Sequence, residues 1–200
     1  MESLSIERRS GLRDFWSIAL FLFLVLVGTL LINTFVFRSF NVLGPSMEST
    51  LYTGDRLIVN RLPVTWSMIK FESYVPERGD VVVFKNPHHS SGTEEEYIVK
   101  RVIAFEGERV TVEKGVLKVY NGTNPAGFLV DETFKDKPGS PTSGEPVDTV
   151  VSKGTIFVAG DHREGEYSYD SRNGLGLIPL YDIIGPVGMR VFPFTAIRLF

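Results

Sequence analysis

Hydrophobic and polar positions divide the chain into one long apolar run and a series of short runs rich in β-branched residues. The long run extends from Phe15 to Phe37 without a charged residue. As a helix rising ~1.5 Å per residue it would reach roughly 35 Å, enough to cross a hydrocarbon core of about 30 Å. A cleaved leader would have a shorter apolar region and a small-residue cleavage site, and residues 33–38 offer no such site. The pattern therefore predicts a retained transmembrane anchor over residues 15–37.

Cationic residues on the two sides of the anchor set its predicted orientation. Arg8, Arg9 and Arg13 precede the run, whereas Arg38 is the only cation after it until Arg56. Positive residues near a span favour the cytoplasmic side of the membrane. We therefore expect a single-pass protein of the cell membrane (plasma or inner), with residues 1–14 in the cytoplasm and residues 38–200 outside.

Residues 38–200 have the sequence pattern of a β-rich domain, in which Gly, Asp and Asn separate short runs of β-branched residues. The predicted strands are Arg56–Asn60, Asp80–Phe84, Tyr97–Ala104, Arg109–Val112, Val116–Tyr120 and Thr155–Ala159. Residues 62–74 are compatible with a helical turn or an amphipathic excursion that carries Trp66, Ile69 and Phe71. No other stretch after the anchor shows sustained helical periodicity. The sequence thus predicts a mainly β domain, built as an antiparallel β-barrel or a sandwich-like arrangement.

The composition changes between residues 121 and 150, where Gly, Pro, Ser, Thr, Asp and Glu predominate. Such residues favour turns and loops. The segment has too few apolar residues to fill a core of its own. We therefore expect a loop-rich β excursion from the main sheet, within a single extracytoplasmic domain.

Composition and charge exclude several classes of protein and site. Hydrophobic residues make up 43% of the chain and charged residues 22%, which excludes intrinsic disorder. A net charge of −3 provides no basic footprint for nucleic acid. The absence of cysteine removes disulfides, thiolate metal sites and cysteine nucleophiles. His88 and His89 lie in a polar loop, and adjacent Asp161 and His162 would point to opposite faces of an extended segment, so we expect no metal site.

Two residues carry candidate chemistry. Ser46 follows Gly44 and Pro45 in a sharp turn, a common motif that can also present a serine nucleophile with backbone N–H groups beside it. Lys100 lies on one face of an apolar strand, with Arg101 on the other. Lys100 is either at an edge with a snorkelling stem or buried. A buried lysine favours its neutral amine, which can take a proton from a serine, as in Ser-Lys enzymes.

Six motifs follow the anchor in order: Gly44–Leu51, Gly54–Asp55, Arg78–Phe84, Lys100–Ile103, Gly160–Arg163 and Asp170–Pro179. In this order they resemble the motifs of bacterial type I signal peptidases, and the resemblance covers nearly the whole chain. Those enzymes are membrane-anchored serine proteases that remove N-terminal signal peptides from exported preproteins. The resemblance implies signal peptides as substrates, contact with the lipid bilayer, proximity to the secretion translocon and no cofactor.

Residue by residue, the resemblance implies that Ser46 is the nucleophile and Lys100 the general base, with the Ser171 hydroxyl orienting the lysine amine. Some relatives carry a serine oxyanion donor at the position of Gly44, so here a main-chain N–H or water would serve. The positions implied to brace the site through ion pairs are Asp161, Arg163, Asp170 and Arg172. The positions implied to line shallow pockets for an Ala-x-Ala cleavage site are Phe40, Val42, Leu57, Val83 and Val99.

Departures from the family pattern leave some assignments open. Ser49 replaces the usual proline, and the spacing between Arg163 and Asp170 is longer than usual, so Ser168 competes with Ser171 as the orienting hydroxyl. A non-catalytic, membrane-anchored β-module for partner binding is the alternative of a different class. A self-cleaving repressor-type Ser-Lys protease would require a DNA-binding domain in place of the anchor. A histidine-based peptidase of the endoplasmic reticulum type conflicts with Lys100 at the base position.

Overall fold

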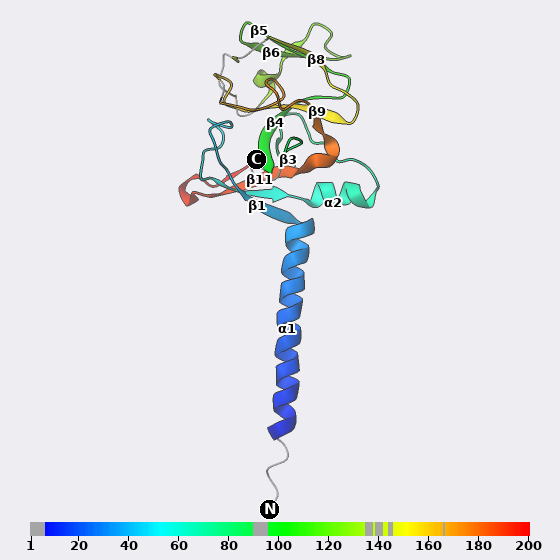
Figure 1. Ribbon diagram of the computed structural model, residues 1–200, viewed down its shortest axis with the longest axis vertical. Coiled ribbons are helices and arrows are strands. Elements are labelled where there is room, and N and C mark those ends of the chain that lie inside the picture. Colours follow the sequence, from blue (N-terminus) through cyan, green and yellow to red (C-terminus); the bar gives the residue numbers. More distant parts are fainter. Residues whose placement is uncertain (1–6, 90–95, 135–137, 139–141, 144–145, 166) are drawn as a thin grey trace, which may run out of the picture.

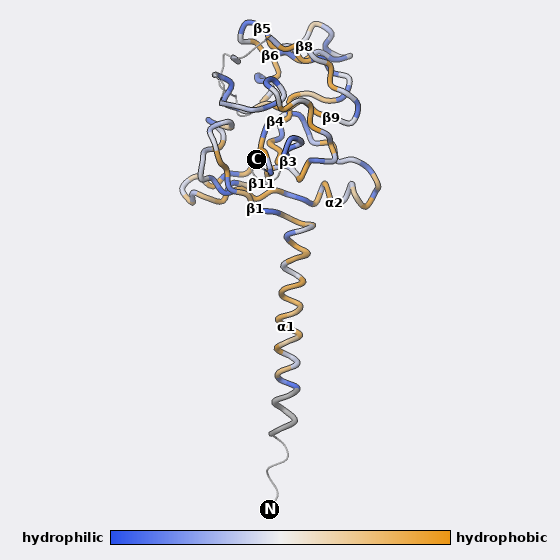
Figure 2. The backbone as a smooth tube through the Cα atoms, in the orientation of Figure 1, coloured by the Kyte–Doolittle hydropathy of each residue, from blue (hydrophilic) through white to orange (hydrophobic). Residues whose placement is uncertain are grey.

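A long helix projects from a β-domain in the computed structural model, which describes residues 7–89, 96–134, 138, 142–143, 146–165 and 167–200 (Figure 1). The helix α1 comprises Glu7–Phe35. Within it, Arg13–Phe35 is long and apolar enough to cross a membrane; its most apolar 18-residue stretch has a mean hydropathy of 2.6, and the described residues bury none of that stretch. Figure 2 shows the hydrophobic colour continuing along this stretch. The predicted class, one apolar helix followed by a mainly β domain, is confirmed.

The chain changes from helix to strand immediately after Phe35, slightly before the predicted end of the apolar span. Strand β1 (Phe37–Asn41) pairs antiparallel with β2 (Arg56–Asn60), and Phe37 lies opposite Asn60. Directly after β2 comes the short helix α2 (Leu62–Ile69), with a proline in its first turn, where the missing N–H is tolerated. The end of α1 and the start of α2 therefore meet at one corner of the β-domain.

Two antiparallel sheets form the β-domain. The larger has eight strands in the order β1-β2-β11-β3-β4-β9-β10, with β12 paired to β11. Its remaining strands and 3-10 turns are β3 (Val81–Lys85), β4 (Tyr97–Phe105), β9 (Thr155–Ala159), β10 (Ile178–Pro179), η2 (Leu180–Asp182), β11 (Ile183–Phe192), η3 (Phe194–Ala196) and β12 (Arg198–Leu199). The described residues form no closed barrel, so the sandwich-like alternative fits.

The smaller sheet has four strands in the order β7-β6-β5-β8. Its elements are β5 (Arg109–Glu113), β6 (Val116–Tyr120), β7 (Phe128–Leu129), the 3-10 turn η1 (Val130–Thr133) and β8 (Val147–Val150). The loop-rich segment 121–150 thus supplies both edge strands of this sheet. Its apolar residues, such as Val130, pack with Val110 and Val119 against Ile103 and Phe157 of the larger sheet.

All six predicted strands are present, as β2, β3, β4, β5, β6 and β9. The sequence pattern does not predict β11, although this strand joins β2 to β3 in the middle of the larger sheet. Gly185, Pro186 and Gly188 give it the appearance of a turn, and its register shifts beside them. A glycine is required at 185 because a Cβ there would lie 2.3 Å from the Asn60 carbonyl oxygen.

Candidate active site

The Gly-Pro-Ser turn holds Ser46 at the surface of the larger sheet. Gly44 has a φ of +82°, which favours glycine, and Glu48 N–H donates to the Pro45 carbonyl at 3.0 Å. The next residues anchor the turn, because Met47 and Leu51 are fully buried in a core cluster. The turn therefore presents the Ser46 hydroxyl from a fixed backbone.

Strand β4 carries Lys100 directly beside this turn. Its side chain is buried, with 3% of the residue exposed. The Nζ atom lies 2.8 Å from Ser46 Oγ and donates to the Val99 carbonyl at 3.0 Å. Of the two positions that the sequence leaves open for Lys100, the structure has the buried one. Ser46 and Lys100, 54 residues apart in sequence, are in hydrogen-bond contact.

Gly160 fills the narrow space between Ser46 and Ser168. An added Cβ at Gly160 would lie 2.1 Å from Ser168 Oγ and 2.3 Å from the Ser46 carbonyl oxygen. The backbone on both sides is fixed, since His162 N–H donates to the Ser46 carbonyl at 3.1 Å and Gly160 N–H donates to Asp170 at 2.8 Å. Ser168 is buried, with 1% of the residue exposed. Because a Cβ at Gly160 would approach both residues, the Ser168 hydroxyl lies close to the Ser46 backbone.

Ser171 directs its hydroxyl away from this space. Its Oγ donates to the Gly176 carbonyl at 2.7 Å and accepts from Val158 N–H at 3.0 Å. These bonds fix the loop after Asp170 to β9. The backbone uses the proton and one lone pair of this hydroxyl, and the expected contact between Ser171 and the lysine amine stays a prediction.

Asp161 links the serine turn to the lysine strand. Its carboxylate, fully buried, accepts from the Arg101 guanidinium at 2.8 and 2.5 Å and from the Thr50 hydroxyl at 2.5 Å. Thr50 belongs to the turn that presents Ser46, and Arg101 follows Lys100 in β4. The position of Ser46 relative to the lysine amine is thus fixed by a buried ion pair, in which Arg101 is a partner that the sequence does not identify.

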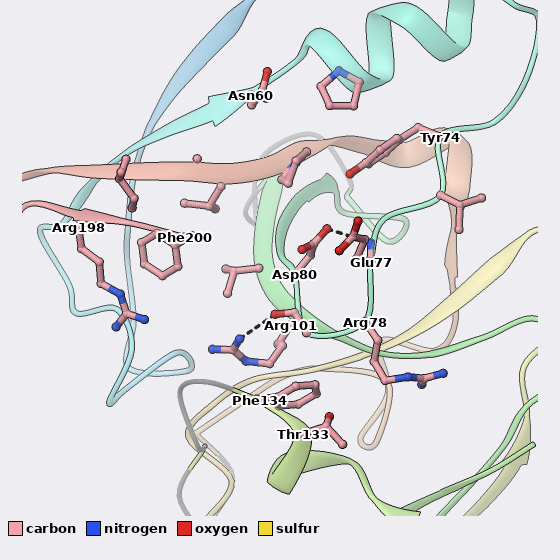
Figure 3. A pocket seen from close by; sticks show the side chains of 18 residues that line it. Asn60, Tyr74, Glu77, Arg78, Asp80, Arg101, Thr133, Phe134, Arg198 and Phe200 are labelled. Carbon is pink, nitrogen blue, oxygen red and sulfur yellow. Dashed lines mark hydrogen bonds between the residues drawn. The ribbon is translucent and has the colours of Figure 1, made fainter. Parts of the chain in front are cut away.

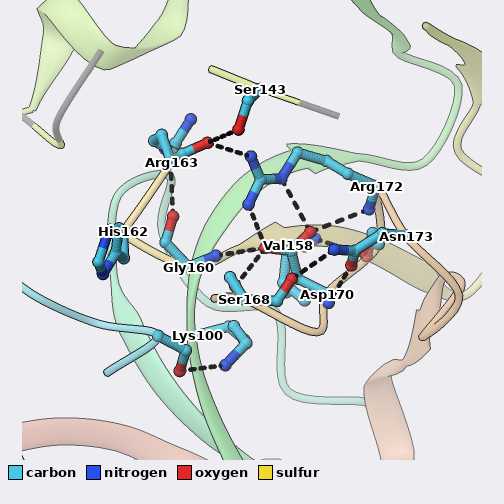
Figure 4. A network of polar contacts seen from close by, with 12 residues as sticks. Lys100, Ser143, Val158, Gly160, His162, Arg163, Ser168, Asp170, Arg172 and Asn173 are labelled. Carbon is cyan, nitrogen blue, oxygen red and sulfur yellow. Dashed lines mark hydrogen bonds and ion pairs between the residues drawn. The ribbon is translucent and has the colours of Figure 1, made fainter. Parts of the chain in front are cut away.

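A second buried network surrounds Asp170 (Figure 4). Its carboxylate accepts from Arg172 at 2.7 Å, from the Ser168 hydroxyl at 2.5 Å and from Gly160 N–H. Burial alone would raise the pKa of Asp170, but these hydrogen bonds and the Arg172 charge together hold it below its ordinary value. The network is therefore intact at neutral pH and is lost only as the pH falls through that lowered pKa.

Arg163 lies between the two sheets and is fully buried. It donates to the Gly160 carbonyl at 2.6 Å and pairs with Asp131 of η1 at 2.6 and 2.9 Å. The sequence does not point to Asp131, which lies in the loop-rich segment. This ion pair attaches the smaller sheet to the loop that carries Gly160.

A groove of about 270 Å³ leads to Lys100 from the outside. All five positions named as pocket residues line it: Phe40, Val42, Leu57, Val83 and Val99. The other lining residues include Tyr97 and Ile98 of β4. On this stretch of β4, β3 pairs one side, and β9 pairs only Arg101–Phe105 on the other. Among the described residues, no strand covers that second side at Tyr97–Lys100.

A larger cavity, about 610 Å³, lies elsewhere, and neither Ser46 nor Lys100 lines it (Figure 3). Tyr74, Glu77, Asp80 and Arg101 are among its lining residues. Burial, with the nearby charges of Asp80 and Glu77, raises the pKa of Tyr74 to about 12, so this phenol is no base at neutral pH. The larger cavity is therefore separate from the contact between Ser46 and Lys100.

The histidines make structural contacts. His162 Nδ1 lies 3.2 Å from the Pro45 carbonyl, its ring stacks on Tyr167, and the neighbouring Asp161 faces Arg101 instead. His88 Nε2 lies 3.2 Å from the Leu175 carbonyl. Within the described part of the chain, no three His, Asp or Glu residues gather as a metal site would require.

Comparisons with known proteins identify the family of this chain. The family model for signal peptidase, peptidase S26, matches residues 15–192. Signal peptidase I of Bacillus amyloliquefaciens is 35% identical over 97% of this chain and 93% of its own length. Signal peptidase IB of Staphylococcus aureus (strain N315) is 32% identical over 84% of each chain. The solved structure of a signal peptidase I from Enterococcus faecalis V583 aligns with a TM-score of 0.40 and 21% identity, covering 56% of this chain and 96% of that one. A match over most of the chain, together with relatives above 30% identity, means that the protein belongs to the signal peptidase family, peptidase S26.

Proposed function

We propose that this membrane-anchored serine peptidase is a signal peptidase I that removes N-terminal signal peptides from exported preproteins, with Ser46 as nucleophile and Lys100 as general base. The observation that carries the proposal is the 2.8 Å contact between Lys100 Nζ and Ser46 Oγ on a buried lysine. Purified protein in detergent should cleave a preprotein after its signal peptide, and an inactive Ser46→Ala variant is the reference.

The geometry supports a Ser-Lys acyl-transfer mechanism. The neutral Lys100 amine removes the Ser46 proton while Oγ attacks the scissile carbonyl carbon. The Ser46 N–H stabilises the resulting oxyanion, since Pro45 has no N–H to offer. The lysine ammonium then returns the proton to the departing amine, which leaves an acyl-enzyme. Water, deprotonated by the same amine, hydrolyses the ester and restores Ser46.

The open side of β4 fits the substrate as an added strand. An extended peptide beside Tyr97–Lys100 would gain main-chain hydrogen bonds and place alternate side chains in the groove. The groove walls, among them Val42 and Val83, are apolar and close to the dyad. We propose that they accept small side chains at the cut, in keeping with an Ala-x-Ala preference.

We further propose that Ser168, and not Ser171, positions the lysine amine. Ser168 donates its proton to Asp170, so its oxygen lone pairs remain for the amine. Ser168→Ala should lower kcat about 10- to 100-fold with little change in KM, the range expected for losing a hydrogen bond to an ionisable group. Ser171→Ala, in the same loop, is the matched control and should stay within a few-fold of wild type. A larger loss in Ser171→Ala would return the positioning role to that residue.

The proposed topology places the N-terminus in the cytoplasm and the β-domain outside. A protease added to intact spheroplasts should remove a tag fused through a flexible linker to Phe200 and leave an N-terminal tag intact. Both tags should disappear after lysis, which controls for access. Loss of the N-terminal tag alone from intact spheroplasts would mean that the orientation is inverted.

A further inference from the structure

The helix α2 is attached to the last residues of the membrane-spanning helix. Arg61 N–H donates to the Val36 carbonyl at 2.8 Å, and the Thr65 hydroxyl donates to the Phe35 carbonyl at 2.7 Å. Figure 1 shows α2 extending sideways from the end of α1, across its axis. If α1 crosses the bilayer, these two hydrogen bonds hold α2 at the bilayer surface.

One face of α2 is apolar and exposed. Leu62, Trp66 and Ile69 recur at helical spacing, with 53%, 61% and 64% of each residue exposed. Val64, on the opposite side of the helix, is the residue buried against the β-domain. Phe71, just after α2, is 98% exposed. A stripe of this kind, including a tryptophan, is typical of helices that lie in the membrane interface.

Two guanidinium groups lie at the same corner. Arg38 of β1 contacts the rings of Phe40 and Tyr97, at 5.1 and 4.6 Å, and donates to the Tyr97 hydroxyl. Arg61 has a buried Nε without a hydrogen-bond partner. Neither arginine forms an ion pair with a carboxylate of the described residues. Burial and the Arg38 charge lower the pKa of Arg61, which indicates that the two cations are close.

We propose that α2, Phe71, Arg38 and Arg61 form a second membrane contact that binds an anionic phospholipid. The apolar stripe enters the headgroup boundary, and the exposed ends of the two guanidiniums bind the lipid phosphate. Arg38 also packs on Phe40 and Tyr97, which line the groove next to Lys100. The lipid contact therefore fixes the height of the groove above the bilayer, where a membrane-held substrate leaves the lipid.

The depth of α2 can be measured with the protein's own tryptophans. The chain has two, Trp16 and Trp66. Trp16→Phe leaves Trp66 as the only tryptophan in the full-length protein, which is reconstituted in vesicles of phosphatidylcholine and phosphatidylglycerol and excited at a wavelength that tyrosine does not absorb. We expect lipids brominated near the headgroup to quench Trp66, and aqueous iodide to quench it weakly. Strong iodide quenching without bromolipid quenching, or burial of Trp66 in a cross-linked dimer, would overturn the proposal.

The headgroup preference tests the arginines. The association of spin-labelled phosphatidylglycerol, relative to spin-labelled phosphatidylcholine, should fall about fivefold in Arg61→Gln, the effect of about one interfacial cation. Arg61→Lys should keep most of the preference. Arg56→Gln, at the far end of β2, is the matched control and should leave the headgroup preference unchanged.

Two outcomes would overturn the proposal. An equal loss of preference in Arg56→Gln would indicate a general charge effect, and abolition of the preference by millimolar inorganic phosphate would indicate an ion site. Neither measurement uses peptide cleavage, so a failed lipid site and a failed catalytic assignment are distinguishable.

Discussion

Replacing Ser46 by alanine should abolish preprotein cleavage, and so should replacing Lys100 by alanine. Each change removes one partner of the 2.8 Å contact, either the nucleophile or the group that accepts its proton. Loss of one member of such a catalytic unit lowers kcat by about 10⁴-fold or more. The rates should be measured on a signal-peptide substrate with purified, detergent-solubilised protein, whose folding is checked by thermal unfolding.

Two exposed residues provide matched controls for this experiment. Ser49→Ala changes the same turn, and Lys85→Ala changes the end of the neighbouring strand β3. Both variants should retain near wild-type rates. The pH dependence of kcat/KM adds an independent check, because the rate should rise with pH as the Lys100 amine loses its proton, and burial places this rising limb below the ~10.4 of free lysine. Substantial cleavage by Lys100→Ala, or a wild-type limb near that value, would refute the assignment of Lys100 as base.

Local sequence patterns were sufficient to predict the strands that follow one rule, namely that a buried strand is a short apolar run bounded by turn residues. β4 and β9 are nearly continuous apolar runs between turn residues, and both are buried in the structure. β11 does not follow the rule, because close packing on Asn60 requires Gly185 and the adjacent proline adds a further turn signal. The need for that glycine arises from a residue 125 positions away in sequence, so no local window contains it.

The same distinction applies to the candidate site. Lys100 stands out because it is a lysine among apolar residues, whereas the Gly-Pro-Ser turn of Ser46 is a common motif that gains meaning only from the ordered motifs around it. The partners that fix their positions are ordinary charged residues until the fold unites them. Asp161 pairs with Arg101, and Arg163 pairs with Asp131, across separations of 60 and 32 residues. Ser168 and Ser171 are only three residues apart, yet the Ser168 hydroxyl donates to the Asp170 carboxylate, whereas the Ser171 hydroxyl bonds two backbone groups.

Substituting Gly160 by alanine should also reduce cleavage severely. The new Cβ would approach both Ser168 Oγ and the Ser46 carbonyl to within 2.3 Å, so that the backbone of the nucleophile or the Ser168 side chain must move. A displacement of about 1 Å in a catalytic group can cost about 10²-fold in rate. Overpacking of a buried site also lowers the free energy of unfolding by about 1–3 kcal/mol. We therefore expect a fall of about 10²-fold in kcat/KM together with a lower Tm.

Gly122→Ala is the matched control for this substitution, because an added Cβ at Gly122 meets no atom within 4 Å and its φ is not in the left-handed region. That variant should keep both the rate and the Tm of the wild type. The two readouts separate the effects: rates measured well below the lowered Tm report the displacement of Ser46, since the folded fraction is then unchanged. If Gly160→Ala cleaved at the wild-type rate, Gly160 would not control the position of Ser46, and the close approach of Ser168 to the nucleophile would have no catalytic role.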